Sequence, residues 1–254
     1  MDAQVREADE LQRFAARLIA AGPAGVRLLL IGGFRYRLLD GSHRFSADID
    51  YHWDGDLRQK QQALRNYCNR VVLPEAKRLL GYEASASGRT GPDAESPNSA
   101  FLDLRFWKAE CAVEIPLEIT RIVTLDPPAI RTVHGTIYPT VSDADQIEAK
   151  ILAVLNRVYL QHRDLVDVFL YGDRLRPDSP ARLKQKVSAL AIPPGAIRQR
   201  LQDLDQHTPY HAAAIQKVID TQVEPPVAEQ MNSGGGGQTV LAESLKTIKR
   251  VCPR

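Results

Sequence analysis

The sequence predicts an α+β protein: a small mixed β-sheet core with flanking helices, followed by an α-helical C-terminal domain. Two observations predict this fold. In the first half of the 254-residue chain, segments with helical hydrophobic spacing alternate with short strand-like apolar runs. From Ser142 onward only the helical spacing recurs. Hydrophobic residues make up 44% of the chain, which is enough for a sizeable core.

The elements expected in the first half follow from the spacing of apolar residues and from the turn residues between them. The apolar run that ends at Gly32-Gly33 is typical of a buried strand that breaks into a loop. The predicted helices cover residues 7–21, 34–39 and 57–80. The predicted strands cover residues 26–31, 47–53, 82–86, 100–107, 112–122 and 132–138, with an exposed loop over 91–98.

The second half is expected to be helical and divided by prolines. Ser142 can cap a helix in which Ile147, Ile151 and Leu155 recur at helical spacing. Pro225-Pro226, Ser233 and the four glycines after it are typical of a flexible linker. The expected domains are therefore a core over residues 1–138, a helical domain over 139–222, and a flexible linker and C-terminal tail over 223–254.

Composition excludes several classes of protein. The chain has 33 Lys and Arg against 31 Asp and Glu, a formal charge of +2, which argues against coating of nucleic acid by bulk charge. The longest aliphatic run, Leu28–Ile31, is too short to cross a bilayer, and the N-terminus is acidic where a signal peptide would be basic. The three cysteines are odd in number and far apart. We therefore expect a cytoplasmic protein with free thiols and no membrane partner.

The segment Leu28–Trp53 contains the residues with the clearest chemistry. A strand ends in Gly32-Gly33, and Asp48 and Asp50 lie two apart on the next strand, so their carboxylates share a face. Paired carboxylates suit Mg²⁺ or Mn²⁺, and two such ions about 4 Å apart can support an in-line phosphoryl transfer. The glycines let a polyanion approach the backbone. An isolated D-x-D is common at solvent-facing strand edges, but its combination with the strand and glycines is more specific.

The order of strand, Gly-Gly, helix and Asp-Ile-Asp resembles the polymerase-β-type nucleotidyltransferase superfamily. Residues 44–50, RFSADID, resemble its AbiEii/AbiGii toxin branch, and residues 150–170, KILAVLNRVYLQHRDLVDVFL, are similar to the Lys, Arg and Arg-Asp-x-x-Asp pattern of that branch. Bulky Phe34 and the fourteen residues between Gly33 and Asp48 depart from the common superfamily pattern. The resemblance covers the chain from about Val26 to Leu170.

The resemblance implies transfer of a nucleoside monophosphate from a nucleoside triphosphate to an acceptor, with release of pyrophosphate. Members of the branch are typically toxins of toxin–antitoxin pairs, and some modify the acceptor end of tRNA. We therefore expect Mg²⁺ or Mn²⁺ as cofactor, a nucleoside triphosphate as substrate, tRNA as acceptor and an antitoxin protein as partner. Asp48 and Asp50 would hold the metal, and Gly32, Gly33 and Ser46 would contact the nucleotide.

The superfamily also implies a third metal-binding carboxylate on a later strand. The segment VEIPLEITR offers Glu118 and Glu114, which share a face because they are four apart in an extended run. Glu118 is the first choice because its Leu-Glu-Ile context matches the branch better, and Asp103 is a further alternative. Each of these carboxylates could equally belong to the polar face of a half-buried strand.

Lys150, Arg157 and Asp164 are seven residues apart and would line one stripe of a continuous helix, with Asp167 beside Asp164. Lys150 would bind the triphosphate. Asp164 would either orient Lys150 or accept the proton of the acceptor hydroxyl. A solvated helix face with ordinary ion pairs is the alternative.

Basic residues supply the expected RNA contacts, namely Arg35, Arg37, Arg44 and the segment Arg174–Arg200, which has seven basic residues and one acidic. A solvated helix face is the commoner meaning of such a basic segment.

Other interpretations of the same residues stay open. His43 and His52 flank the aspartates and could complete a transition-metal site of a hydrolase. The same core could modify a protein or a small molecule such as an antibiotic. A non-catalytic scaffold that binds a partner is the third alternative.

Overall fold

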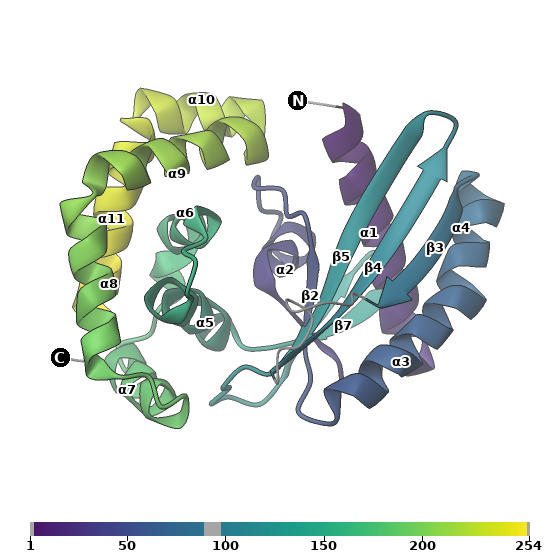
Figure 1. Cartoon of the computed structure of the whole chain (residues 1–254), viewed down its shortest axis with the longest axis horizontal. Coiled ribbons are helices and arrows are strands. Elements are labelled where there is room, and N and C mark those ends of the chain that lie inside the picture. Colours follow the sequence, from purple (N-terminus) through teal and green to yellow (C-terminus); the bar gives the residue numbers. More distant parts are fainter. Residues whose placement is uncertain (1–2, 89–97, 253–254) are drawn as a thin grey trace. The chain divides into compact units, whose positions relative to one another are not determined.

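The computed structural model describes residues 3–88 and 98–252 (Figure 1). The chain forms two compact units, Met1–Ile122 with Pro128–Val141, and Val123–Pro127 with Ser142–Arg254. The predicted boundary after residue 138 therefore lies close to the observed one, but the sequence did not indicate that 123–127 belong to the second unit. The predicted loop over 91–98 lies outside the described residues except for Asn98.

The first unit is built on a seven-stranded sheet with strand order β3-β4-β5-β2-β1-β7-β6. Strand β2 is parallel to β5 and β1 is parallel to β7, whereas the other neighbours are antiparallel, so the sheet is mixed as predicted. The strands are β1 Leu29–Ile31, β2 Ile49–His52, β3 Glu83–Gly88, β4 Ser99–Lys108, β5 Cys111–Thr120, β6 Ala129–Val133 and β7 Thr136–Thr140.

Three helices pack on one face of this sheet, α1 Ala3–Ala21, α3 Leu57–Tyr67 and α4 Leu73–Leu80 (Figure 1). Leu102, Leu117 and Ile119 point into this core and are fully buried. The predicted helix over 57–80 is interrupted by a wider turn at Cys68–Val72. Pro74 follows this turn, and its missing N–H removes one bond of a regular α-helix. The short helix α2 Gly32–Leu39 follows β1 directly.

The single strand predicted over 132–138 is wrong. These residues span the end of β6 and the start of β7, which form an antiparallel hairpin. His134 and Gly135 connect the strands with φ of +47° and +76°. Two consecutive residues with positive φ are the geometry of a tight hairpin turn, whose twist matches that of the flanking strands.

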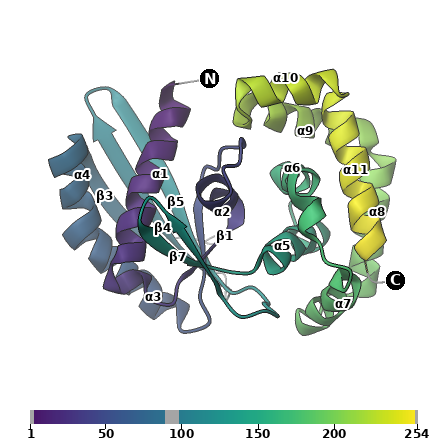
Figure 2. The ribbon, with the colours of Figure 1, turned by 180° about the vertical axis from the view of Figure 1, so that it is seen from behind.

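The second unit is helical, as predicted (Figure 2). Ser142 caps its first helix by accepting a hydrogen bond from the Asp145 N–H at 3.0 Å. Helix α11 packs against α9 and α6. The helices are α5 Asp143–Asn156, α6 His162–Tyr171, α7 Ser179–Ala189, α8 Pro194–Gln206, α9 Thr208–Gln222, α10 Pro225–Ser233 and α11 Gly236–Val251.

The flexible linker and tail predicted over 223–254 are also wrong, because the described part of this segment forms α10 and α11. Leu241 and Ile248 of α11 are buried in the core of the second unit. Gly235 and Gly236 have φ of +100° and +55° and form the turn between the two helices. At Gly237 a Cβ would collide with the Ala212 carbonyl of α9. The glycines therefore allow a tight turn and a close helix contact.

None of the helices in the described residues is long and apolar enough to span a membrane.

Candidate active site

Two partly exposed carboxylates project from one face of the sheet in the first unit. Asp50 of β2 lies opposite Glu118 of β5 in the parallel register. Neighbouring strands are about 4.8 Å apart, so the two side chains project side by side from the same face. The residues that alternate with them, such as Ile49 and Leu117, are buried in the core. Asp48 lies just before β2, at the edge of the same site.

The register distinguishes Glu118 from the other two candidates for the third carboxylate. Glu114 lies four residues away, about 13 Å along the strand, and forms an ion pair with Arg105 at 2.8 Å. Asp103 is on β4 opposite Pro116, so β5 separates it from Asp50. The structure therefore brings Glu118, and neither alternative, next to Asp50.

Ser99 contributes to this site and was missed in the sequence analysis. Its hydroxyl donates a hydrogen bond to Glu118 Oε1 at 2.7 Å. Ser46 has the matching role at the other end, where its hydroxyl donates to Asp48 Oδ1 at 2.8 Å. Both hydroxyls orient a carboxylate without adding charge. Ser99 had no local signal, because its position depends on the pairing of β4 with β5.

Gly32 and Gly33 pack directly against the aspartate segment. Gly32 has a φ of +76°, and a Cβ there would collide with the Asp50 carboxylate. At Gly33 a Cβ would collide with the Arg44 guanidinium and lie 2.8 Å from the Ser46 hydroxyl. The first turn of α2 is therefore held against the carboxylates. Helix N-termini present N–H groups that bind phosphate, so this arrangement suits a polyphosphate that also contacts bound cations.

Two of the three arginines expected to contact RNA from this region are buried and have structural roles instead. Arg35 is fully buried, with an ion pair to Asp40 at 2.7 Å. Arg44 is also buried and donates to the Phe45 carbonyl at 2.8 Å. The prediction that Arg35 and Arg44 contact RNA is wrong, because a buried guanidinium cannot reach a macromolecule in solution. Arg37 is 13% exposed and is paired with an aspartate of α1 at 3.1 Å.

The alternative transition-metal site at His43 and His52 is not formed. His52 is buried, and its Nδ1 accepts a hydrogen bond from the Ile122 N–H at 3.1 Å. His43 is exposed. In the described part of the chain, a group of three metal-ligating side chains with all ligand atoms within 4.8 Å of one another occurs elsewhere, in the second unit. Asp48, Asp50 and Glu118 do not meet that spacing, although carboxylates that straddle two ions about 4 Å apart can be more widely spaced.

In the second unit, Lys150 is held by two buried aspartates. Its Nζ lies 2.7 Å from Asp164 Oδ1 and 2.9 Å from Asp167 Oδ2. Arg157 contacts the other oxygen of Asp164 at 2.8 Å. Asp164 and Asp167 are almost completely buried, so this is not the solvated helix face considered as the alternative. Both oxygens of Asp164 therefore face cations, which suits a positioning role better than that of a general base.

The continuous helix predicted through Lys150, Arg157 and Asp164 is wrong. Helix α5 ends at Asn156, Arg157 has an extended backbone with φ −64° and ψ +139°, and α6 begins at His162. The side chains still meet, because α5 and α6 pack against each other. Tertiary packing thus produces the cluster that the seven-residue spacing had attributed to one helix.

Two of the seven basic residues of the segment 174–200, Arg182 and Lys186, are buried, whereas the other five are partly or fully exposed. Arg182 and Lys186 each form ion pairs with Asp145, both at 2.7 Å, and with Glu148, at 2.8 and 2.9 Å respectively. All four side chains are buried. The interpretation of this segment as a solvated face or an RNA surface is therefore wrong for its central residues, whereas Lys184 of the same segment is exposed.

The environment of Asp145 explains how the buried network stays charged. Burial acts to raise the pKa of Asp145, but the Lys186 ammonium and the N–H groups of Leu125 and Asp126 lower it overall. The hydrogen bonds of these two N–H groups to the Asp145 carboxylate are 3.0 Å long. This contact attaches the segment 123–127 to the second unit.

Comparison with solved structures identifies the class of protein that this fold defines. The chain is similar to a candidate nucleotidyltransferase from H. pylori, with 15% identity and a TM-score of 0.61, over 99% of this chain and 96% of the other. It is also similar to JHP933 from Helicobacter pylori, with 14% identity and a TM-score of 0.59, over 99% and 93% of the two chains. No curated protein matches the chain. The fold is therefore that of a nucleotidyltransferase.

The family follows from a match over most of the sequence. Residues 13–232 match the family described as the nucleotidyl transferase AbiEii toxin of Type IV toxin–antitoxin systems. The chain belongs to this family, which confirms the resemblance stated from the sequence. It is a nucleotidyltransferase of a toxin family, and membership implies an antitoxin as partner.

Proposed function

We propose that this protein is a toxin that transfers a nucleoside monophosphate from a nucleoside triphosphate to the 3′ end of tRNA, with Mg²⁺ or Mn²⁺ as cofactor. The observation that carries the proposal is the parallel register that sets Asp50 beside Glu118, with Gly32 packed against the Asp50 carboxylate. Family membership supports the class of reaction. The tRNA acceptor rests on the resemblance alone, and the cytoplasmic location on the acidic N-terminus and the scattered cysteines.

The residues at the site fit a divalent cation of the hard type. Asp48, Asp50 and Glu118 supply only carboxylate oxygens, which Mg²⁺ and Mn²⁺ prefer, and all three side chains are partly exposed. When bound, such a cation would neutralise phosphate charge and lower the pKa of a bound hydroxyl. Ser46 and Ser99 would orient the carboxylates toward it.

The reaction we propose is an in-line displacement at the α-phosphorus. The acceptor hydroxyl oxygen forms a bond to the α-phosphorus, the bond from that phosphorus to the bridging oxygen breaks, and pyrophosphate leaves with the electron pair. The hydroxyl proton passes to solvent. Gly32 and Gly33 would let the triphosphate approach the backbone, and the N–H groups at the start of α2 would donate to its oxygens.

On the resemblance alone we assign to Lys150 the binding of the triphosphate, and we assign to Asp164 the positioning of Lys150. The assignment of Asp164 is supported by its 2.7 Å contact with the Lys150 ammonium and by its 2.8 Å contact with Arg157. A carboxylate between two cations holds them in place more readily than it accepts a proton.

The decisive experiment supplies each radiolabelled nucleoside triphosphate with Mg²⁺ or Mn²⁺ and total tRNA. We expect labelled RNA from the native protein and its loss in Asp48→Ala and Glu118→Gln. Glu114→Gln is the matched control, because Glu114 is on the same strand face but far from Asp50, and it should keep full activity. Unchanged labelling in Asp48→Ala would overturn the mechanism. If the label appears on protein or on a small molecule instead of RNA, the proposed tRNA acceptor is wrong and the labelled species is the acceptor.

A further inference from the structure

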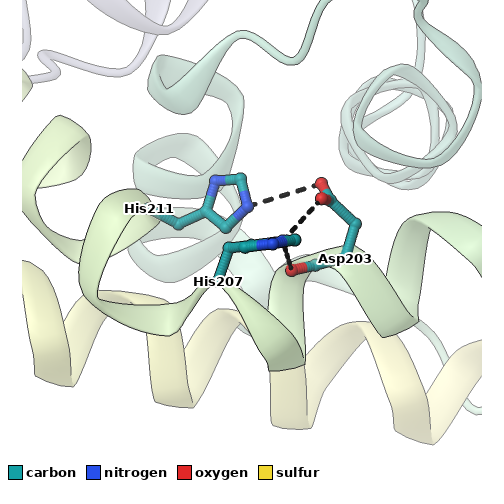
Figure 3. A group of neighbouring side chains, drawn as sticks. All are labelled: Asp203, His207 and His211. Carbon is teal, nitrogen blue, oxygen red and sulfur yellow. Dashed lines mark hydrogen bonds and ion pairs between the residues drawn. The ribbon is translucent and has the colours of Figure 1, made fainter.

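A second group of potential metal ligands lies in the helical unit, at the junction of α8 and α9 (Figure 3). Asp203, His207 and His211 are spaced four residues apart, so they follow one another along the same side of the chain as it passes from α8 to α9. One ligand atom from each side chain lies within 4.8 Å of the other two.

The distances at this group approach those of a tetrahedral metal site. His207 Nδ1 lies 2.9 Å from Asp203 Oδ1, and His211 Nε2 lies 3.4 Å from Asp203 Oδ2. Bonds of about 2.0–2.1 Å to a tetrahedral zinc ion place two ligand atoms about 3.3 Å apart. Figure 3 shows both rings turned toward the carboxylate. Small side-chain rotations would therefore suffice to close the group around an ion.

A hydrogen bond from another helix prepares His211 for such a role. Its Nδ1 lies 3.0 Å from Nε2 of His162, the first residue of α6. If the His211 proton is on Nδ1 and is donated to His162, the lone pair on His211 Nε2 faces Asp203. In metal sites the second ring nitrogen of a ligating histidine usually makes such a bond, which selects the tautomer.

His211 Nε2 is an unsatisfied buried polar atom. The residue is 4% exposed, and Nε2 has no hydrogen-bond partner among the residues that the structure describes, since its 3.4 Å approach to Asp203 lacks hydrogen-bond geometry. A buried, unsatisfied nitrogen beside a carboxylate is the arrangement that a cation between them would satisfy.

We propose that Asp203, His207 and His211 form a binding site for one divalent transition-metal ion, most suitably Zn²⁺, with water completing its coordination. Two imidazoles and one carboxylate are a common zinc ligand set. The site is chemically distinct from the all-carboxylate site of the first unit, because imidazole selects Zn²⁺ over Mg²⁺. The side chains of His207 and Asp203 are 60% and 39% exposed, which leaves a route for the ion.

Among the described residues, Arg200 is the arginine that forms an ion pair with Asp203, and its Nη1 is 3.7 Å from Asp203 Oδ2. Its Nη2 donates to the Arg157 and Val158 carbonyls, which directs the guanidinium toward the loop before α6. The bound ion would connect α8 to α9 directly and to α6 through His162. We therefore expect zinc to stabilise the helical unit.

The test uses the full-length protein without a histidine tag, stripped of metal and titrated with ZnCl₂ by calorimetry. We expect one zinc ion per chain and an increase in Tm with zinc concentration. The titration is repeated on Asp48→Ala, which removes a carboxylate of the other site. Retained binding in this variant supports the proposal, and loss of binding would assign the zinc to the carboxylate site instead.

The ligand assignment is tested with His207→Gln. His207 is exposed, so this substitution is not expected to disturb folding. We expect at least a tenfold loss of zinc affinity, and loss of the visible absorption that Co²⁺ acquires when bound in place of zinc. His134→Asn is the control, since His134 is exposed in the β6–β7 turn at φ +47°, which asparagine tolerates. Equal affinity in His207→Gln and the native protein, or no zinc-dependent change in Tm, would overturn the proposal.

Discussion

The two units of the protein use acidic side chains in opposite ways. In the first unit, Asp48, Asp50 and Glu118 are partly exposed, and hydroxyl groups donate to two of them. In the second unit, Asp145 and Glu148 are completely buried and paired with Arg182 and Lys186. A buried charge is costly unless a partner compensates it, whereas a partly exposed carboxylate can exchange water for an ion.

This difference shows that the kind of residue does not by itself reveal its role. Lys186 and Arg182 come from a strongly basic segment that is typical of a phosphate-binding surface. Their burial makes them part of the interior, where they neutralise aspartate and glutamate. Exposure and partners, which are properties of the folded chain, therefore separate structural charges from those available to a substrate.

The largest effect on stability is expected from Lys186→Met. The substitution leaves Asp145 and Glu148 buried with one cation fewer, and breaking a buried pair in this way costs about 3–5 kcal/mol. Lys184→Met is the matched control, because Lys184 lies on the exposed side of the same helix. Urea denaturation measures both. Similar midpoints for the two variants would contradict the structural role of the buried network.

A smaller effect on stability, but a specific effect on catalysis, is expected from Gly32→Ala. Gly32 and Gly41 both have positive φ, +76° and +67°, so alanine at either position adds about 1–2 kcal/mol of backbone strain. Only at Gly32 would the new Cβ also collide with the Asp50 carboxylate; at Gly41 no atom lies within 4 Å. We therefore expect nucleotidyl transfer to fall at least tenfold in Gly32→Ala alone. Equal rates of nucleotidyl transfer in Gly32→Ala and Gly41→Ala would show that the contact between Gly32 and Asp50 does not matter for catalysis.

The smallest effect is a dependence of stability on pH, measured in the presence of a chelator. Burial lowers the pKa of His162 and His211 below the ordinary value of 6.5. The unfolded chain then binds more protons than the folded one, so the free energy of unfolding should decrease as the pH falls below 6.5. The pKa of Asp145 is lowered from its ordinary value of 3.8, so stability should decrease further as the pH falls below 3.8. A free energy of unfolding that stays constant between pH 7 and 5 would contradict the lowered pKa of His162 and His211.

Much of the candidate site was predictable from short-range patterns. Alternation along a strand predicted that residues two apart share a face, and the glycines before α2 indicated a close approach of the backbone. The structure adds the physical reason for both glycines, because side chains there would collide with Asp50 and Arg44. The sequence alone left Glu118, Glu114 and Asp103 open as the third carboxylate, and the strand register places Glu118 beside Asp50.

The remaining errors share one cause. The predicted strand over 132–138 ran through Gly135 without a break, and the four glycines after Ser233 were interpreted as a linker. Local patterns could not show the hairpin or the helix pair that form there. The interruption at Arg157 had no proline or glycine to announce it. His207 and His211 are four residues apart, a spacing that the sequence analysis did not use, whereas His162 belongs to another helix and its proximity to His211 had no sequence signal.

Local periodicity and turn residues in the chain were sufficient for the α+β class and for most helices and strands. Folding in three dimensions was needed to place Glu118 beside Asp50 and Ser99 against Glu118, to bury Arg35, Arg44 and Lys186, and to pack α11 into the helical core. The reason is that periodicity depends only on neighbours a few residues apart. Strand register and helix packing depend on contacts between residues far apart in sequence.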